Sequence, residues 1–199
     1  LSRSVATWGN TVAAVLKDCD IPAHVESNTG YFSSYEIQVI LSMLRILDNP
    51  LQDIPMAAVL ASPIVGMDDE ELAQIRSAFK GVSFAQAALS AMAGEDGYED
   101  EKLKAFALVF ERLRGAVADT PIHELLYMML DETGFYRYAS AMPAGKRRRQ
   151  NIDMLIEMAA AYEKTSYKGL FHFVRYIDIQ QKYEIDYGEA DTAGENDDV

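Results

Sequence analysis

The sequence predicts a mainly α-helical fold, with at most a short strand or two near the N-terminus. Apolar residues recur at helical spacing along almost the whole of the 199-residue chain. The clearest stripe consists of Ile37, Ile40, Leu41, Leu44 and Leu47. No fixed repeat accompanies the pattern, which argues against a solenoid. These observations favour a multi-helix globular domain.

Start and stop signals divide the chain into about nine helices. The expected helices cover residues 8–16, 33–47, 53–60, 68–79, 83–92, 103–117, 121–133, 148–162 and 168–182. Residues 135–142 form a short helix or a turn, and residues 24–26 form a short extended piece. Proline or glycine follows most of the helix ends, because neither residue continues a helix easily.

Polar residues at the expected helix starts indicate how these helices are capped. Ser33 and Glu36 have the spacing of a capping box, as do Asp68 and Glu71. Thr120, just before a proline, is expected to cap the helix over 121–133. Among the side chains expected to face the core are Phe84, Ala88, Leu89 and Met92 in one helix and Leu170, Phe171, Val174 and Ile177 in the last.

Composition and charge limit the kinds of partner. The net charge is −13, which argues against nucleic acid, but residues 184–199 carry seven acidic residues and no basic one. The rest of the chain therefore holds only about half of the negative charge. No apolar run approaches the roughly 18 to 20 residues that cross a bilayer, so no membrane contact is expected. The single cysteine, Cys19, suits a reducing cytoplasm, and the start without Met suggests a piece of a longer polypeptide.

No catalytic or metal-binding pattern is visible, so neither kind of site is expected in this chain. The one Gly-Lys pair, Gly145-Lys146, is followed by Arg147 where a phosphate-binding loop requires Ser or Thr. His24, His123 and His172 stand apart from one another and outside the spacings of zinc sites. Cys19 lacks an activating neighbour and suits a small core residue better than a nucleophile.

Positive charge is concentrated in one place, Lys146-Arg147-Arg148-Arg149, just before an expected helix. Such a cluster can contact phosphates, and the alternative is a solvated helix entry. The only tryptophan, Trp8, could stack on a base, although a lone Trp at helical spacing more often lies in the core.

Several consecutive motifs resemble the UvrD/Rep-type superfamily 1 DNA helicases. Their Gly-aromatic turn, Glu-Ile helix start, Leu-Arg-x-Leu segment, Asn-Pro break and Ser-Pro-x-x-Gly turn are matched in order by Gly30-Tyr31-Phe32, Glu36-Ile37, Leu44–Leu47, Asn49-Pro50 and Ser62–Met67. Within that superfamily, residues 48–76 are most similar to the A subunit of the bacterial AddAB helicase–nuclease. Arg149-Gln150-Asn151-Ile152 resembles an Arg-x-Asn-Leu helix start of the same family.

The resemblance implies an accessory domain of an ATP-dependent DNA helicase and exonuclease that acts in double-strand break repair. Residues 1–50 would be a remnant of the second motor domain, residues 51–183 the helical accessory domain and residues 184–199 an acidic tail that returns to the motor. The segment 94–100 is either an internal linker or a surface loop. ATP, Mg²⁺ and an iron–sulfur cluster would bind elsewhere in the parent protein, and the partners would be DNA and an AddB-like subunit in the bacterial cytoplasm.

The residues expected to contact DNA combine this resemblance with the charge pattern. They are Arg3, Trp8, Gly30, Tyr31, Phe32, Gly66, Lys146, Arg147, Arg148 and Arg149. For Tyr31 and Phe32 the alternative is core anchoring, and Glu36 is interpreted as a helix cap. Val65 stands where the family often has a basic residue, which weakens the prediction for the Gly66 turn. The rival function is a helical interaction or scaffold domain that touches no DNA.

Overall fold

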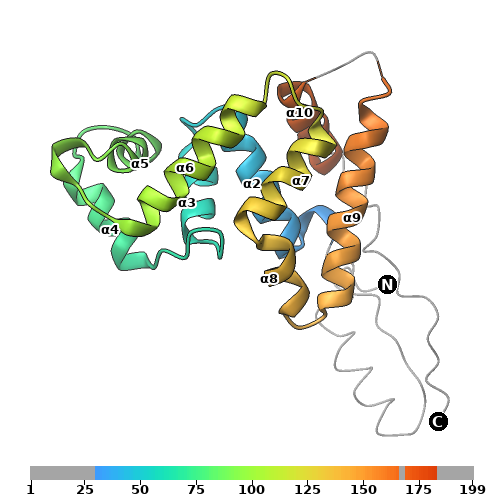
Figure 1. The fold of residues 1–199 in the computed structure, drawn as a ribbon, viewed down its shortest axis with the longest axis horizontal. Helices are drawn as coiled ribbons and strands as arrows, with labels where there is room; N and C mark the ends of the chain where they lie inside the picture. The colour runs from blue at the N-terminus through green and yellow to red at the C-terminus, as the bar shows by residue number, and fades with distance from the viewer. Residues whose placement is uncertain (1–29, 166–168, 183–199) are drawn as a thin grey trace, which may run out of the picture.

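The computed structural model describes residues 30–165 and 169–182. Within these ranges it contains nine α-helices, two short 3-10 helices and no strand (Figure 1). The mainly α-helical prediction is therefore confirmed. The expected helix over 8–16, the extended piece over 24–26 and the N-terminal strands lie outside the described residues.

The helices follow one another with short connections. In chain order the elements are η1 (Tyr31–Ser33), α2 (Tyr35–Asp48), α3 (Asp53–Ala61), α4 (Asp69–Ala78), α5 (Phe84–Met92), η2 (Glu95–Gly97), α6 (Glu101–Ala116), α7 (Ile122–Thr133), α8 (Phe135–Ala141), α9 (Gly145–Tyr162) and α10 (Leu170–Lys182). Most of these bounds lie within one or two residues of the expected ones, because capping groups and prolines are visible in the sequence.

Helix α2 forms the centre of the fold. It packs against α3, α6, α9 and α10, and Ile37, Ile40 and Leu44 on its expected stripe are completely buried. Met43 and Ile46, which lie off the stripe, are buried as well. A helix that is apolar on most sides needs neighbours on most sides, and α2 has them.

The other helices extend the fold in two directions from α2. Helices α7, α8, α9 and α10 gather at one end, α4 and α5 lie at the other, and α6 runs between the two (Figure 1). The buried residues form a single cluster to which α2 and α3 both contribute. The boundary expected at residue 50 stays a prediction.

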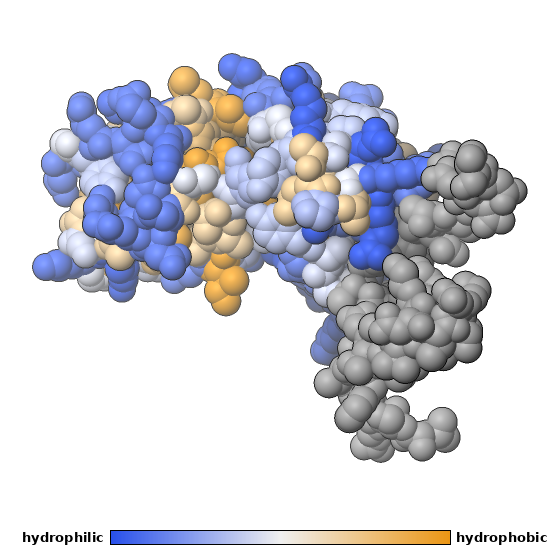
Figure 2. All heavy atoms as spheres, turned by 90° about the horizontal axis from the view of Figure 1, so that it is seen from below, coloured by the Kyte–Doolittle hydropathy of each residue, from blue (hydrophilic) through white to orange (hydrophobic). Residues whose placement is uncertain are grey.

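The surface differs between these parts. Seen from below, the end that carries α4 and α5 is densely polar, and apolar side chains reach the surface beside it (Figure 2). Three of the most exposed apolar side chains are Leu51, Ile54 and Leu108.

Two of the capping predictions are wrong, and one is confirmed. Asp68 and Glu71 form the expected box at the start of α4, with both bonds at 2.8 Å. At α7 the N-cap is Pro121 rather than Thr120, and the carboxylate of Glu163, from the end of α9, accepts the Ile122 N–H at 2.5 Å. Ser33 does not cap α2, because its hydroxyl donates to the Gly30 carbonyl instead.

The inward face of two helices also differs from the expectation. Helix α5 is buried through its alanines, including Ala85, Ala88 and Ala91, while Phe84 and Leu89 are only partly buried. The last helix buries Phe173, whereas Phe171 is 53% exposed; Leu170, Val174 and Ile177 are buried as expected. The small alanine face lets α5 approach α3 closely.

Candidate nucleic-acid interface

The Gly-aromatic turn forms η1 and anchors the core. Tyr31 is completely buried and Phe32 is 6% exposed, with the two rings edge to face at a centroid distance of 5.0 Å. The Tyr31 hydroxyl donates to the Asn151 carbonyl at 2.9 Å, and burial raises the pKa of this phenol well above its usual range. Neither ring offers a face on which a base could stack, and Gly30 beside them is partly exposed.

Glu36 is a buried partner of α9, and its interpretation as a helix cap is wrong. The residue is 2% exposed. Its Oε1 accepts from Asn151 Nδ2 at 2.7 Å, and its Oε2 accepts from the Arg148 guanidinium. A buried carboxylate persists only when it is paired and hydrogen-bonded, and these two donors meet that condition. The interaction fixes the start of α2 against the first turns of α9.

The basic cluster lies entirely inside α9, which begins at Gly145, earlier than the start at residue 148 that the sequence pattern predicted. Helix α9 begins at Gly145, and a Cβ at that position would lie 1.9 Å from the Ser140 carbonyl oxygen. Glycine therefore permits the close approach of α9 to the end of α8. This close approach lets α9 begin earlier in the chain than expected. Lys146 and Arg147 are exposed in its first turn.

The four basic residues of the cluster have different surroundings. Arg148 turns inward to Glu36, and its Nε donates to the Pro143 carbonyl at 3.0 Å. Lys146, Arg147 and Arg149 are exposed. Cations at a helix N-terminus oppose the helix dipole by some tenths of a kcal/mol each. A phosphate group would reverse that penalty.

A hollow of about 230 Å³ lies where the N-termini of α2 and α9 meet. Ser33, Ser34 and Tyr35 line it from one side, and Arg147 and Arg148 from the other. Neither helix start has a side-chain cap. Backbone N–H groups at such starts bind anions well, and here hydroxyl and guanidinium groups stand beside them.

Two tyrosines that the sequence did not mark accompany the hollow. Tyr35 is 43% exposed and Tyr138, from α8, is 45% exposed. Partial burial, followed by Tyr138, raises the pKa of Tyr35, and Arg148 opposes the rise. Tyr35 lines the hollow together with Arg148. Exposed rings beside cations suit stacked bases and their phosphates. Tyr35 could have been predicted from the sequence, because it closely follows Tyr31 and Phe32. Tyr138 could not, because it belongs to α8, far from Tyr35 along the chain.

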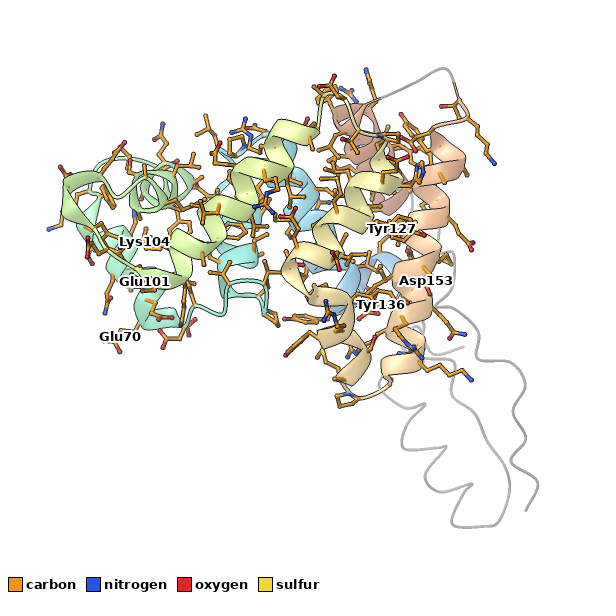
Figure 3. All side chains as sticks on the ribbon, viewed as in Figure 1. Glu70, Glu101, Lys104, Tyr127, Tyr136 and Asp153 are labelled. Carbon is orange, nitrogen blue, oxygen red and sulfur yellow. The ribbon has the colours of Figure 1, made fainter. Side chains whose placement is uncertain are left out.

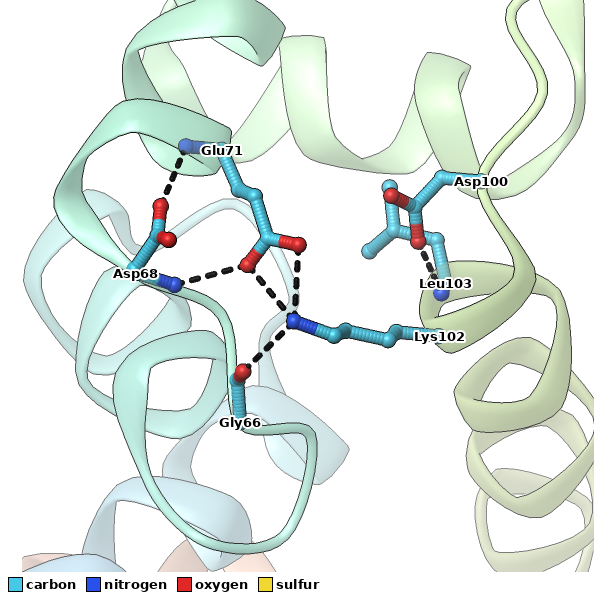
Figure 4. Close-up of polar contacts among 6 residues, drawn as sticks. All are labelled: Gly66, Asp68, Glu71, Asp100, Lys102 and Leu103. Atoms are coloured by element: carbon cyan, nitrogen blue, oxygen red, sulfur yellow. Dashed lines mark hydrogen bonds and ion pairs between the residues drawn. The ribbon is translucent and has the colours of Figure 1, made fainter.

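The Gly66 turn is tied to α6 by a lysine. Gly66 has φ +74°, and its carbonyl accepts from Lys102 Nζ at 2.8 Å. The same Nζ contacts both carboxylate oxygens of Glu71 at 2.7 Å, and Glu71 also accepts the Asp68 N–H (Figure 4). Asp100 caps α6 just before this lysine. The turn between α3 and α4 lies well away from the start of α9 (Figure 1).

This tie predicts an acid-dependent loss of stability. The Lys102 hydrogen bond, followed by the Asp68 N–H, lowers the pKa of Glu71 below its ordinary value of 4.5. A carboxyl group whose pKa is lowered by folding stabilises the fold at pH values above its unfolded pKa. This contribution disappears as the pH falls through the folded pKa. We expect Lys102→Met to lower the urea midpoint at pH 7 and to match the wild type more closely below about pH 4.

Lys104→Met is the matched control, because Lys104 is an exposed neighbour paired with Glu99 and Glu101 at the surface. Urea midpoints of the three proteins between pH 3 and 7 measure the effect. A wild-type advantage over Lys102→Met that stays constant across this range would exclude the Glu71 contact as its source.

Arg3 and Trp8 lie outside the described residues. Among residues 30–165 and 169–182, no group of three or more His, Cys, Asp and Glu side chains could hold a metal ion. In the same ranges, no helix is both long and apolar enough to cross a membrane.

Curated relatives match almost the whole chain. It is 42% identical over 182 residues to the A subunit of the ATP-dependent helicase/nuclease of Anoxybacillus flavithermus, a match that covers 90% of this chain and 15% of the relative. It is 37% identical over 201 residues to the A subunit from Oceanobacillus iheyensis, covering 100% of this chain and 16% of the relative. The chain belongs, as a segment, to the helicase/nuclease A-subunit family. The resemblance read from the motifs is thereby confirmed.

The match to the A-subunit family extends over many species. The A subunit from Lachnoclostridium phytofermentans is 35% identical over 242 residues, which covers 99% of this chain and 18% of that relative. No protein-family model matches the chain. Because it spans less than a fifth of these three relatives, the activity of the whole protein does not transfer to it directly.

Proposed function

We propose that this segment is the accessory domain inserted into the second motor domain of an ATP-dependent DNA helicase/nuclease, and that it guides DNA. The parent protein would act in double-strand break repair and recombination in the bacterial cytoplasm, together with an AddB-like subunit. Family membership supports the parent activity. The observation that carries the DNA contact is the hollow between α2 and α9, where two helix N-termini meet the exposed side chains of Arg147 and Tyr35.

The ATP-binding and iron–sulfur sites of the parent protein would lie outside this segment. The chain has one cysteine, so it cannot supply the several thiolates that an iron–sulfur cluster needs. It also lacks the glycine-rich loop that holds the phosphates of ATP. The segment alone should therefore neither hydrolyse ATP nor cut DNA. Its own residues would bind and orient the nucleic acid.

Binding of the 199-residue chain to fluorescent forked DNA at low salt tests this proposal. We expect measurable affinity, and a loss of about tenfold to hundredfold when Lys146, Arg147 and Arg149 are changed together to alanine, because phosphate contacts dominate affinity at low salt. Arg148 is left in place because it pairs with Glu36.

Lys80→Ala with Lys104→Ala is the control, since both lysines are exposed and belong to the region of α4 and the start of α6. This double variant should bind like the wild type. Equal loss in both variants would indicate a general charge effect. Wild-type protein that binds no forked DNA even at low salt would refute the guiding role.

The second candidate function is a scaffold that holds the partner protein without touching DNA. The net charge of −13 and exposed apolar residues such as Leu51, Ile54 and Leu108 favour it. Under this alternative, the isolated segment would bind the AddB-like partner, and the triple variant would bind it as tightly as the wild type.

A further inference from the structure

A second recess lies between α7, α8 and α9, on the other side of α8 from Tyr138. Its volume is about 230 Å³. Leu130 and Ile156, 4% and 6% exposed, give it an apolar base, and the rings of Tyr127 and Tyr136 border it. Tyr127 is 58% exposed, although a phenol ring of this size is more often at least half buried. The recess therefore presents an aromatic face to solvent above an apolar base.

Polar groups of both signs surround these rings. The Tyr136 hydroxyl donates to Asp153 at 3.1 Å, and these two residues lie close together between α8 and α9 (Figure 3). Asp131 and Arg137 form a loose pair at 3.9 Å, and both side chains are more than four-fifths exposed. Burial, followed by Asp153, raises the pKa of Tyr136, and Arg149, one helical turn before Asp153, opposes the rise.

This combination suits one kind of ligand. A nucleobase is flat, stacks on an aromatic ring, and carries hydrogen-bond donors and acceptors on its edge. Asp153 accepts one hydrogen bond from Tyr136, and a carboxylate can accept more. Arg137 and Arg149 are placed to meet the adjacent phosphates. A basic side chain of a partner protein fits less well, because these two arginines already stand beside the carboxylates.

We propose that the recess between α7, α8 and α9 binds an unpaired nucleotide of single-stranded DNA, with the base on Tyr127 and its edge at Asp153. The inference rests on the proposed function and deepens it, since it distinguishes a single strand from a duplex. Arg149 belongs to the cationic cluster of α9 and would connect the recess with the hollow at the start of that helix.

Tyr127→Ala tests this site, because the exposed ring can be removed without opening the core. Binding of a short single-stranded oligonucleotide should weaken about tenfold, since one stacked base contributes on the order of that factor. Tyr127→Phe, which keeps the aromatic ring, should bind the oligonucleotide about as tightly as the wild type. Binding of blunt duplex DNA should not change, because a paired base cannot enter the recess. Fluorescence anisotropy of both DNAs with all three proteins measures this.

The matched control is Phe171→Ala, which removes a ring of similar exposure, 53% against 58%, from α10 and away from both proposed sites. If Tyr127→Ala binds the single-stranded oligonucleotide as tightly as the wild type does, the proposed nucleotide site is wrong. The proposed function would still stand in that case, provided that the protein binds forked DNA. If the wild type binds no DNA at all, both the nucleotide site and the proposed function are wrong. NMR signals of Leu130 and Ile156 that respond to an arginine-rich peptide and not to the oligonucleotide would identify a polypeptide site and overturn the inference.

Discussion

Arg148→Met is expected to lower the free energy of unfolding by about 3 kcal/mol, because it leaves the Glu36 carboxylate buried without its cation. Glu36 is 2% exposed, and the side chain of Arg148 is 23% exposed. Asn151 still donates to the carboxylate but carries no charge. Urea denaturation of the full chain measures the loss.

The partner variant separates this effect from lost packing. Arg148→Met combined with Glu36→Gln should recover much of the stability, because a neutral amide no longer needs the guanidinium. Arg149→Met, on the exposed side of the same helix turn, should change the free energy of unfolding by less than about 0.5 kcal/mol. If Arg148→Met lowers the free energy of unfolding no more than Arg149→Met does, the buried Glu36 carboxylate does not depend on Arg148.

Leu113→Ala should cost about 2 to 5 kcal/mol of unfolding free energy, because it empties space in the core beneath α6. Leu113 is completely buried. Leu108, in the same helix, is 71% exposed and provides a matched control with identical chemistry. Leu108→Ala should stay within about 0.5 kcal/mol of the wild type. Similar losses at the two positions, measured by urea denaturation, would contradict the orientation of α6.

Local signals in the sequence were sufficient for most helices. The α4 capping box and the end of α2 at Asp48 depend on residues only a few positions apart, so the sequence contains the whole interaction. Phe171 and Phe173 show the limit of periodicity. Both are close to a 3.6-residue stripe, and only the packing of α10 against α2 determines which ring is buried.

The candidate site could be predicted only in part. The cationic cluster was visible as a run of charges, but the separate role of Arg148 was not. Glu36 has the spacing of a cap, and its true partners lie 112 and 115 residues further along the chain. No local rule relates residues so far apart. The family resemblance marks the segments around Glu36 and Asn151 separately, and in the structure the side chain of Asn151 donates a hydrogen bond directly to Glu36.

The salt dependence of forked-DNA binding tests the central claim most directly. Each phosphate that a cation neutralises contributes about −0.9 to the slope of log K against log salt concentration for duplex DNA. If Lys146, Arg147 and Arg149 contact phosphates, the slope of the triple alanine variant should be shallower than that of the wild type by about two to three. Equal slopes for the two proteins would contradict the assignment of this helix start as a DNA interface.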